Sequence, residues 1–180
     1  MNGRELVIGL TGGIAAYKSA ALVSQLVQAG AEVSVVMTRS AGKFVGATTF
    51  QALTGRDVLT RMFNPRAHRL GAHIELASSA ELLCVAPATA NFLAKAAGGL
   101  ADNLLSTLYL SFSGPVLLAP AMNCQMWDQP AVQRNVSRLR EDGVHIIDPE
   151  EGWLSCRKTG VGRMASPEKI FAAIQQQLDG

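Results

Sequence analysis

The sequence predicts an α/β fold of the three-layer, Rossmann-like (flavodoxin-like) type, in which a doubly wound parallel sheet carries helices on both faces. Three observations lead to this prediction. Short apolar segments alternate along the chain with longer segments of helical period. Several apolar segments are continuously hydrophobic, as strands covered on both faces are. Glycine or proline follows most of these segments, where turns between strands and helices are expected.

Five apolar segments are the expected strands. The first is hydrophobic throughout after its initial glutamate and leads directly into two glycines. Pro87 and Pro120 are expected to end the third and fourth strands, because proline has no backbone N–H to donate to a sheet. The expected strands cover Glu5–Leu10, Glu32–Met37, 82–86, 116–119 and 144–147.

Segments with the apolar spacing of a helix separate these strands. Gly30, Gly55 and Gly143 each follow one of them, and glycine at that position commonly ends a helix. Ser166 is the expected N-cap of the last helix. The expected helices cover 14–29, 47–53, 90–97, 102–112, 126–142 and 167–178. The segments 58–63 and 72–76 are ambiguous, and 149–164 lacks periodicity and is expected to be a long loop.

The composition limits the class of protein. Hydrophobic residues make up 48% of the 180 residues and charged residues 17%, which supports a buried core and argues against a disordered chain. This length suits one compact domain over 1–180. The net charge is only +2 and Lys and Arg form no stripe, so we expect no nucleic-acid partner. No apolar run reaches about 18 residues, so we expect no membrane-spanning segment.

The cysteines indicate a reducing compartment. There are three of them, Cys84, Cys124 and Cys156, and this odd number does not suit a disulfide framework. No spacing of Cys and His is typical of zinc, so we expect no metal. The expected location is the cytoplasm.

Small and polar residues follow four of the expected strands, where ligands bind in parallel sheets. Gly12 and Gly13 would let backbone N–H groups approach a phosphate at the start of the next helix, or they simply form a tight turn. The later glycines of a dinucleotide motif are replaced by Ile14 and Ala16, and a Walker lysine pattern is absent, so a mononucleotide is favoured. The candidate cofactor-binding residues are Gly12, Gly13, Ile14, Thr38, Ser40, Thr89, Asn91 and Ala121.

Six segments together resemble the flavin-containing cysteine decarboxylases, and most closely their phosphopantothenoylcysteine decarboxylase branch. The element Pro-x-Met-Asn-x-x-Met-Trp is the most specific of them, and the resemblance covers essentially the whole chain. The segments are Leu-Thr-Gly-Gly-Ile-Ala at 10–15, His-Ile-Glu-Leu at 73–76, Pro-Ala-Thr-Ala-Asn at 87–91, Gly-Leu-Ala-Asp-Asn-Leu-Leu at 99–105, Pro-Ala-Met-Asn-Cys-Gln-Met-Trp at 120–127 and Gly-Trp-Leu-Ser-Cys at 152–156.

The resemblance implies FMN as cofactor and decarboxylation of 4′-phosphopantothenoylcysteine to 4′-phosphopantetheine in coenzyme A biosynthesis. Oxidation of the substrate CH2–SH group to a thioaldehyde would provide the electron sink that loss of CO2 needs, and reduction of the enethiolate would complete the reaction. The resemblance also implies a homo-oligomer, a trimer or an assembly of trimers, with flavin sites at subunit boundaries. Because charged residues are scarce, we expect apolar helix faces around 90–112 to pack between subunits.

Three residues are the candidate catalytic groups. His73 is the candidate base or proton relay, because an imidazole exchanges a proton near neutral pH. Asn123 is the candidate clamp for the substrate carboxylate, because a neutral amide binds it without opposing loss of CO2. Cys156, in the expected loop, is the candidate acid. The structural alternatives are a histidine that caps a strand, an Asx turn and a surface cysteine, whereas Cys84 is expected in the core.

The family loop departs from its usual pattern here, because Ser155 stands where Ala is usual and Arg157 where Gly is usual. We expect the segment 152–164 to act as a lid over the flavin site. Arg157, Lys158 and Arg163 suit either the substrate phosphate or a solvated surface.

Three other functions remain open at this point. A peptidyl-cysteine decarboxylase of peptide maturation would stop at the enethiol and would not need the loop cysteine. A flavin prenyltransferase shares the fold but does not need the chemistry assigned to His73, and the Pro-x-Met-Asn element argues against it. A non-catalytic FMN-binding regulatory subunit would keep the cofactor alone.

Overall fold

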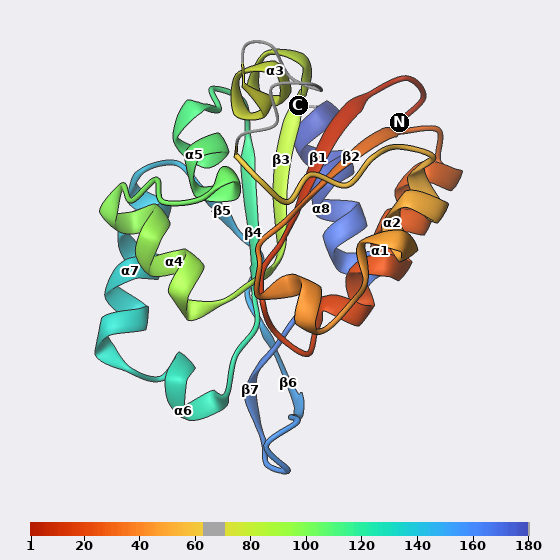
Figure 1. Cartoon of the computed structure of the whole chain (residues 1–180). Coiled ribbons are helices and arrows are strands. Elements are labelled where there is room, and N and C mark those ends of the chain that lie inside the picture. Colours follow the sequence, from red (N-terminus) through yellow and green to blue (C-terminus); the bar gives the residue numbers. More distant parts are fainter. Residues whose placement is uncertain (63–70, 180) are drawn as a thin grey trace.

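The computed structural model describes residues 1–62 and 71–179. Five parallel strands form its sheet in the order β2-β1-β3-β4-β5, which is the flavodoxin-like order (Figure 1). The strands are β1 (Glu5–Leu10), β2 (Glu32–Met37), β3 (Leu82–Ala88), β4 (Val116–Pro120) and β5 (His145–Ile146). The predicted α/β fold with a doubly wound parallel sheet is confirmed, and each expected strand is present.

Helices cover both faces of the sheet, as Figure 1 shows. Residues of α1 (Ala16–Gln28), α2 (Ala47–Thr54) and α8 (Pro167–Asp179) share one buried cluster with the sheet. Residues of α3 (Ala72–Ser79), α4 (Ala90–Gly98), α5 (Leu104–Ser111) and α7 (Pro130–Glu141) share the other. Two short helices, η1 (Ala41–Lys43) and α6 (Cys124–Trp127), follow β2 and β4. The sheet therefore has a separate hydrophobic core on each side.

The alternation of β1 assigns its side chains to the two cores. Ile8 and Leu10 belong to the cluster with α1 and α8, whereas Val7 belongs to the cluster with α4 and α5. Gly9 faces α5 so closely that an added Cβ would lie 2.5 Å from Cδ1 of Leu105. This glycine allows α5 to approach the middle of the sheet.

The two prolines that were expected to end strands lie inside them. β3 continues through Pro87 to Ala88, and β4 continues to Pro120. The pairing of β3 with β4 shifts between Val85 and Ala88, because Pro87 has no N–H for the ladder. The prediction of strand ends at 86 and 119 was therefore wrong by one or two residues.

The expected helix 126–142 is two helices. α6 ends at Trp127, and α7 starts at Pro130, the first position of a helix and one that proline suits. Gln129, directly before the proline, is extended with φ −64° and ψ 131°, because the proline ring disfavours the helical conformation of the preceding residue.

The expected loop 149–164 contains a β-hairpin, so the prediction of a structureless loop was wrong. β6 (Glu150–Trp153) and β7 (Thr159–Arg163) pair antiparallel, with Trp153 opposite Thr159. The hairpin projects from the lower end of the molecule in Figure 1. Its root is attached through Gly162, where a Cβ would lie 2.4 Å from the carbonyl oxygen of Met122. In β7, glycine stands where the backbone approaches a neighbouring segment closely, and apolar residues do not alternate as in an ordinary strand.

Of the ambiguous segments, 72–76 belongs to α3, and Leu59 forms an isolated bridge with Val36. Residue 63 lies outside the described residues. Gly30, Gly55 and Gly143 have φ of 88°, 69° and 85°, which confirms them as helix stops. The Ser166 hydroxyl accepts a hydrogen bond from the Lys169 N–H at 3.2 Å, which confirms the cap of α8.

Among the described residues, no helix has the length and apolarity that a bilayer crossing requires.

The central strand β3 provides a test of the core. Leu83 has 0% of its surface exposed and packs against the helices of one face. Leu83→Ala should lower the free energy of unfolding by about 2–5 kcal/mol, because it leaves a cavity. The exposed control Gln176→Ala on α8 should change it by less than about 0.5 kcal/mol. Urea titrations at one protein concentration measure both, and equal effects would contradict this packing.

Candidate active site

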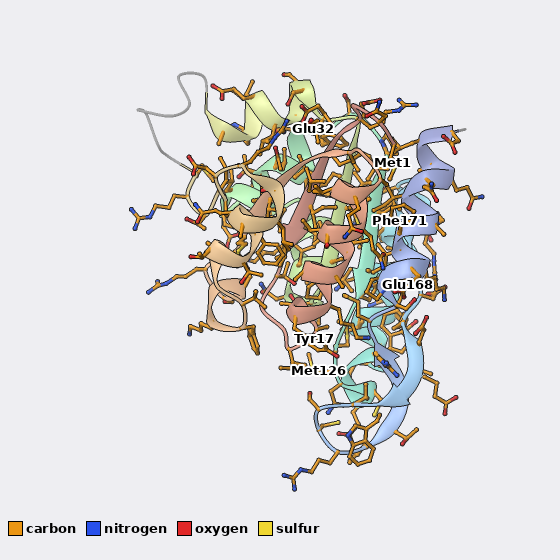
Figure 2. All side chains as sticks on the ribbon, turned by 90° about the vertical axis from the view of Figure 1, so that its right-hand side faces the viewer. Met1, Tyr17, Glu32, Met126, Glu168 and Phe171 are labelled. Carbon is orange, nitrogen blue, oxygen red and sulfur yellow. The ribbon has the colours of Figure 1, made fainter. Side chains whose placement is uncertain are left out.

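A cavity of about 870 Å³ lies at the carboxyl ends of β1 to β4. The segments that follow each of these strands line it, together with one side of the β6–β7 hairpin. Figure 2 shows Tyr17 and Met126, two of the lining residues, at the lower end of the molecule above the hairpin. Met1 and Glu32 lie toward the opposite end in the same view. The volume is at the upper end of the range for small-molecule sites.

The cavity collects most of the residues that the sequence singled out. Asn123 and Cys156 line it, and so do all eight candidate cofactor-binding residues: Gly12, Gly13, Ile14, Thr38, Ser40, Thr89, Asn91 and Ala121. His73 is not among the lining residues. The structure thus brings two of the three candidate catalytic side chains to the expected phosphate loop.

Thr11 connects the two strands that flank this loop. It is the first residue after β1, and its side chain is 2% exposed. The Thr11 hydroxyl donates to the carbonyl of Pro87 at 2.6 Å and accepts from the N–H of Thr89 at 3.0 Å. Because the chain leaves β1 and β3 in opposite directions, this hydroxyl sets the opening between them.

Gly12 and Gly13 are enclosed by the loops that follow β2 and β3. A Cβ on Gly12 would lie 2.4 Å from Cβ of Ser40, and a Cβ on Gly13 would lie 3.6 Å from Cγ2 of Thr89. The backbone at Gly12 can approach Ser40 this closely only without a side chain. The two glycines and the two hydroxyl residues therefore form one small recess at the start of α1.

Asn123 holds its amide in one orientation. It is the N-cap of α6, and its Oδ1 accepts a hydrogen bond from the N–H of Gln125 at 2.7 Å. Because the oxygen is used locally, the Nδ2 donors are the part of the amide available to a ligand in the cavity. The structural interpretation and the functional one are therefore compatible, since the cap holds the amide in an orientation that a ligand could use.

Cys156 lies exposed in the turn of the hairpin and lines the cavity. Arg157, directly after it, is left-handed with φ 61°, and its N–H donates to the carbonyl of Leu154 at 2.9 Å. The arginine thus adopts the conformation for which the family loop usually has glycine. The replacement of the usual glycine by Arg157 therefore leaves the turn intact.

The other two cysteines have different surroundings. Cys84 is fully buried in β3, and burial raises the pKa of its thiol to about 12, so it remains a neutral core residue as expected. Cys124 is half-buried at the start of α6, where its side chain contacts Gly160 of the hairpin. All three cysteines are free.

His73 lies in the first turn of α3, which Figure 1 shows at the upper end of the sheet, opposite the hairpin. Its ring packs on Gly71, where a Cβ would lie 3.2 Å from Cε1 of the histidine. The Nδ1 atom is buried without a hydrogen-bond partner within residues 1–62 and 71–179. Ile74 beside it is 44% exposed.

Several lining residues were not predicted as site residues. They include Thr11, Tyr17, Lys18, Lys95, Asp102 and Trp153. The position of Thr11 directly after an apolar strand was a usable local signal. Asp102 lies in the loop between α4 and α5 and the others lie on helices or on the hairpin, and only the folded chain brings them to this end of the sheet.

A family model with the description "Flavoprotein" matches residues 1–179. The chain belongs to this flavoprotein family. It is 49% identical over 178 residues to the coenzyme A biosynthesis bifunctional protein CoaBC of Bacillus subtilis, a match that covers 99% of this chain and 44% of CoaBC. This flavoprotein thus spans less than half the length of the curated relatives that it matches.

Two solved structures are close to this flavoprotein over nearly its whole length. A cysteine-to-serine variant of a PPC decarboxylase, complexed with pantothenoylaminoethenethiol, is 30% identical with a TM-score of 0.88, and the match covers 99% of this chain and 100% of that one. The FMN-dependent cysteine decarboxylase SpaF is 36% identical with a TM-score of 0.83, and the match covers 98% and 95%.

The donors at the carboxyl ends of the strands suit a flavin mononucleotide. The recess at the start of α1 offers the Ser40 hydroxyl and backbone N–H groups to one phosphate, apart from the Gly13 N–H, which donates to the Thr11 carbonyl at 3.1 Å. The rest of the cavity has small and apolar walls at Ala90, Ala121 and Met122, which a planar ring can contact. Clusters of three or more His, Cys, Asp or Glu that could hold a metal ion are absent from the described part of the chain.

The recess at Gly12 leads to a prediction about cofactor affinity. Gly12→Ala places a methyl group 2.4 Å from Cβ of Ser40 and 3.0 Å from its carbonyl carbon, so the loop must move. The Kd for FMN should rise about 10- to 100-fold, the equivalent of the overpacking cost. Fluorescence titration measures it. Gly42→Ala is the matched control, because no atom lies within 4 Å of its Cβ position, and an equal loss there would contradict this location.

Proposed function

We propose that this flavoprotein binds FMN in the cavity and decarboxylates 4′-phosphopantothenoylcysteine to 4′-phosphopantetheine. The observation that supports this most is that Asn123 and Cys156 line the same cavity as the Gly12-Gly13 recess. These are a carboxylate-binding amide, a proton-donating thiol and a phosphate recess, which this substrate and cofactor require. Residues 1–180 act in this proposal as one FMN-binding domain.

The eight residues at the strand ends hold the cofactor, with its phosphate at Gly12 and Gly13. When bound, FMN supplies the two-electron oxidation of the substrate CH2–SH group to a thioaldehyde and the return of these electrons after CO2 has left. Asn123 binds the substrate carboxylate through Nδ2, since its Oδ1 is engaged by Gln125. A neutral donor orients the carboxylate without the strong attraction of a cation, so the charge can leave as CO2.

Cys156 protonates carbon in the reductive half of the reaction. Loss of CO2 leaves an enethiolate, and saturation of its C=C bond requires a proton as well as two electrons. The Cys156 thiol is exposed in the hairpin turn and lines the cavity, so it can deliver this proton. The PPC decarboxylase structure similar to this chain is a cysteine-to-serine variant that holds an enethiol, which agrees with this role.

The presence of both Asn123 and Cys156 at the cavity favours this function over the alternatives. SpaF, a cysteine decarboxylase, shares the fold, and a peptidyl-cysteine decarboxylase that stops at the enethiol would not need a thiol at the hairpin turn. A flavin prenyltransferase would not need the amide clamp, and a regulatory subunit would need neither group. CoaBC of Bacillus subtilis, named for coenzyme A biosynthesis, favours the phosphopantothenoyl substrate.

A homo-oligomer with shared sites accounts for His73. Its Nδ1 is buried without a partner among the described residues, and such an atom normally finds one. The histidine lies at the end of the sheet opposite the cavity, so it can act only in the cavity of a neighbouring copy. In a trimer or an assembly of trimers, the exposed Ile74, Leu100 and Leu110 would pack between subunits. His73 then takes up the thiol proton of the substrate.

The three free cysteines agree with a cytoplasmic enzyme, because reduced thiols persist in that compartment.

The decisive test incubates the FMN-loaded protein with 4′-phosphopantothenoylcysteine. The native chain should release CO2 and form 4′-phosphopantetheine with no net oxidation. Cys156→Ser should still release CO2 but form the saturated thiol about 10²- to 10⁴-fold more slowly, with the enethiol accumulating. Mass spectrometry distinguishes the products by two hydrogens. Cys124→Ser is the matched control and should retain activity. Absence of CO2 release from the native, FMN-loaded chain would refute the function.

Shared sites predict complementation between two inactive variants. Asn123→Asp keeps the cap of α6 but repels the substrate carboxylate, and His73→Asn removes the proton relay. Each alone should lose about 10² or more of kcat/KM. Oligomers reassembled from an equal mixture should recover about a quarter of the native activity, since random pairing rebuilds that share of sites. Recovery no greater than the average of the two variants would contradict a site built from two copies.

A further inference from the structure

The charged side chains that line the cavity are unequal in number. Lys18, Arg39, Lys95 and Arg163 are cations, and Asp102 is the only anion among the described lining residues. Lys95 is neutralised, because its Nζ lies 2.8 and 2.6 Å from the two carboxylate oxygens of Asp102. Lys18, Arg39 and Arg163 form no ion pair within the described part of the chain. The cavity therefore presents unpaired positive charge.

Two of these cations meet at the root of the hairpin. Lys18 lies in the first turn of α1, and its Nζ donates to the carbonyl of Met164 at 3.1 Å. Arg163, the last residue of β7, directly precedes Met164. The Arg163 side chain lies across Gly152, where a Cβ would come within 3.1 Å of Cδ and Nη1. Both cations are thus held beside each other at the wall of the cavity.

This arrangement costs free energy in the absence of an anion. Burial, and next the charge of Arg163, lower the pKa of the Lys18 ammonium. Glu150 and Glu168 act in the opposite direction, but neither lines the cavity. Glu150 lies 3.9 Å from Lys169, and Glu168 accepts a hydrogen bond from Gln25. An anion in the cavity would relieve the repulsion between the two cations.

The phosphate of the cofactor has a separate place. The Gly12-Gly13 recess is closed by Ser40 and Thr89, which follow β2 and β3. Lys18 is directed instead toward Met164, on the side of the cavity that the hairpin forms. Arg39 also lines the cavity and directly precedes Ser40 in the sequence. The pair of Lys18 and Arg163 thus belongs to the part of the cavity that the substrate would occupy.

We propose that Lys18 and Arg163 bind the terminal phosphate of the substrate and thereby select a phosphorylated cysteine conjugate over an unphosphorylated or peptide one. This inference rests on the proposed function. The two cations are specificity-determining residues, because they contact the end of the substrate remote from the carbon that loses CO2. The cavity wall that holds these two cations is continuous with the walls at Asn123 and Cys156.

Binding of two probes by the FMN-loaded protein tests the proposal directly. Isothermal titration measures the Kd of 4′-phosphopantothenate and that of pantothenate, which lacks only the phosphate. Lys18→Met and Arg163→Gln should each raise the Kd of the phosphorylated probe about 10- to 100-fold, the loss expected for one charged hydrogen bond. The Kd of pantothenate and that of FMN should change less than about twofold. Lys18→Arg should retain most of the preference for phosphate.

Lys43→Met and Arg134→Gln are matched controls, because both residues are exposed and neither lines the cavity. An unchanged preference for the phosphorylated probe in Lys18→Met and Arg163→Gln would overturn the proposal. If these two variants instead lost affinity for FMN, the proposal would also be overturned, and Lys18 and Arg163 would be assigned to cofactor binding. Turnover by the native chain tests the decarboxylase function separately. The preference for the phosphorylated probe is measured without turnover, so its outcome does not depend on whether the native chain decarboxylates the substrate.

Discussion

The hydroxyl of Thr11 is the interaction on which the arrangement of the site depends. It is almost completely buried, and it joins the end of β1 to the end of β3 by donating to Pro87 and accepting from Thr89. The hydroxyl provides the partner of the Thr89 N–H, and it gives the Pro87 carbonyl a second donor beside the Thr11 N–H at 3.3 Å. The hydroxyl fixes the separation of the segments that carry Gly12 and Gly13 after β1 and Thr89 after β3. A cavity can open there because the chain leaves the two strands toward opposite faces.

The hairpin converts this opening into an enclosed cavity. Glycine at 160 and 162 lets β7 lie directly against the start of α6, with Gly162 in contact with the Met122 carbonyl. The N–H of Met122 donates back to the Gly162 carbonyl at 3.0 Å. Residues 120–127, which carry Asn123, are therefore fixed between β4 and the hairpin. Asn123 and Cys156 occupy two walls of one cavity because these two backbones touch.

Much of the fold follows from local pattern. Buried parallel strands require continuous apolar runs, amphipathic helices require their spacing, and glycine ends helices in the left-handed conformation. These requirements act within a few residues, so the five strands and most helices were predicted to within two residues. Pro130 was a local signal too, but the apolar spacing on both sides of it concealed the break between α6 and α7. The hairpin was missed because close contact with Met122 and Cys124, rather than periodicity, selects its residues.

The sequence by itself determined the class of fold and the strand ends whose following residues line the cavity. Both depend on short-range chemistry: Gly12 and Gly13 follow a strand, and Asn123 caps the helix that comes directly after it. Only the tertiary structure decided which distant residues share the cavity. Lys18 contacts Met164, which is 146 positions away, and α3, the helix that carries His73, lies at the opposite end of the sheet. Such relations depend on how the layers pack and on where the hairpin folds back, and no local pattern contains that information.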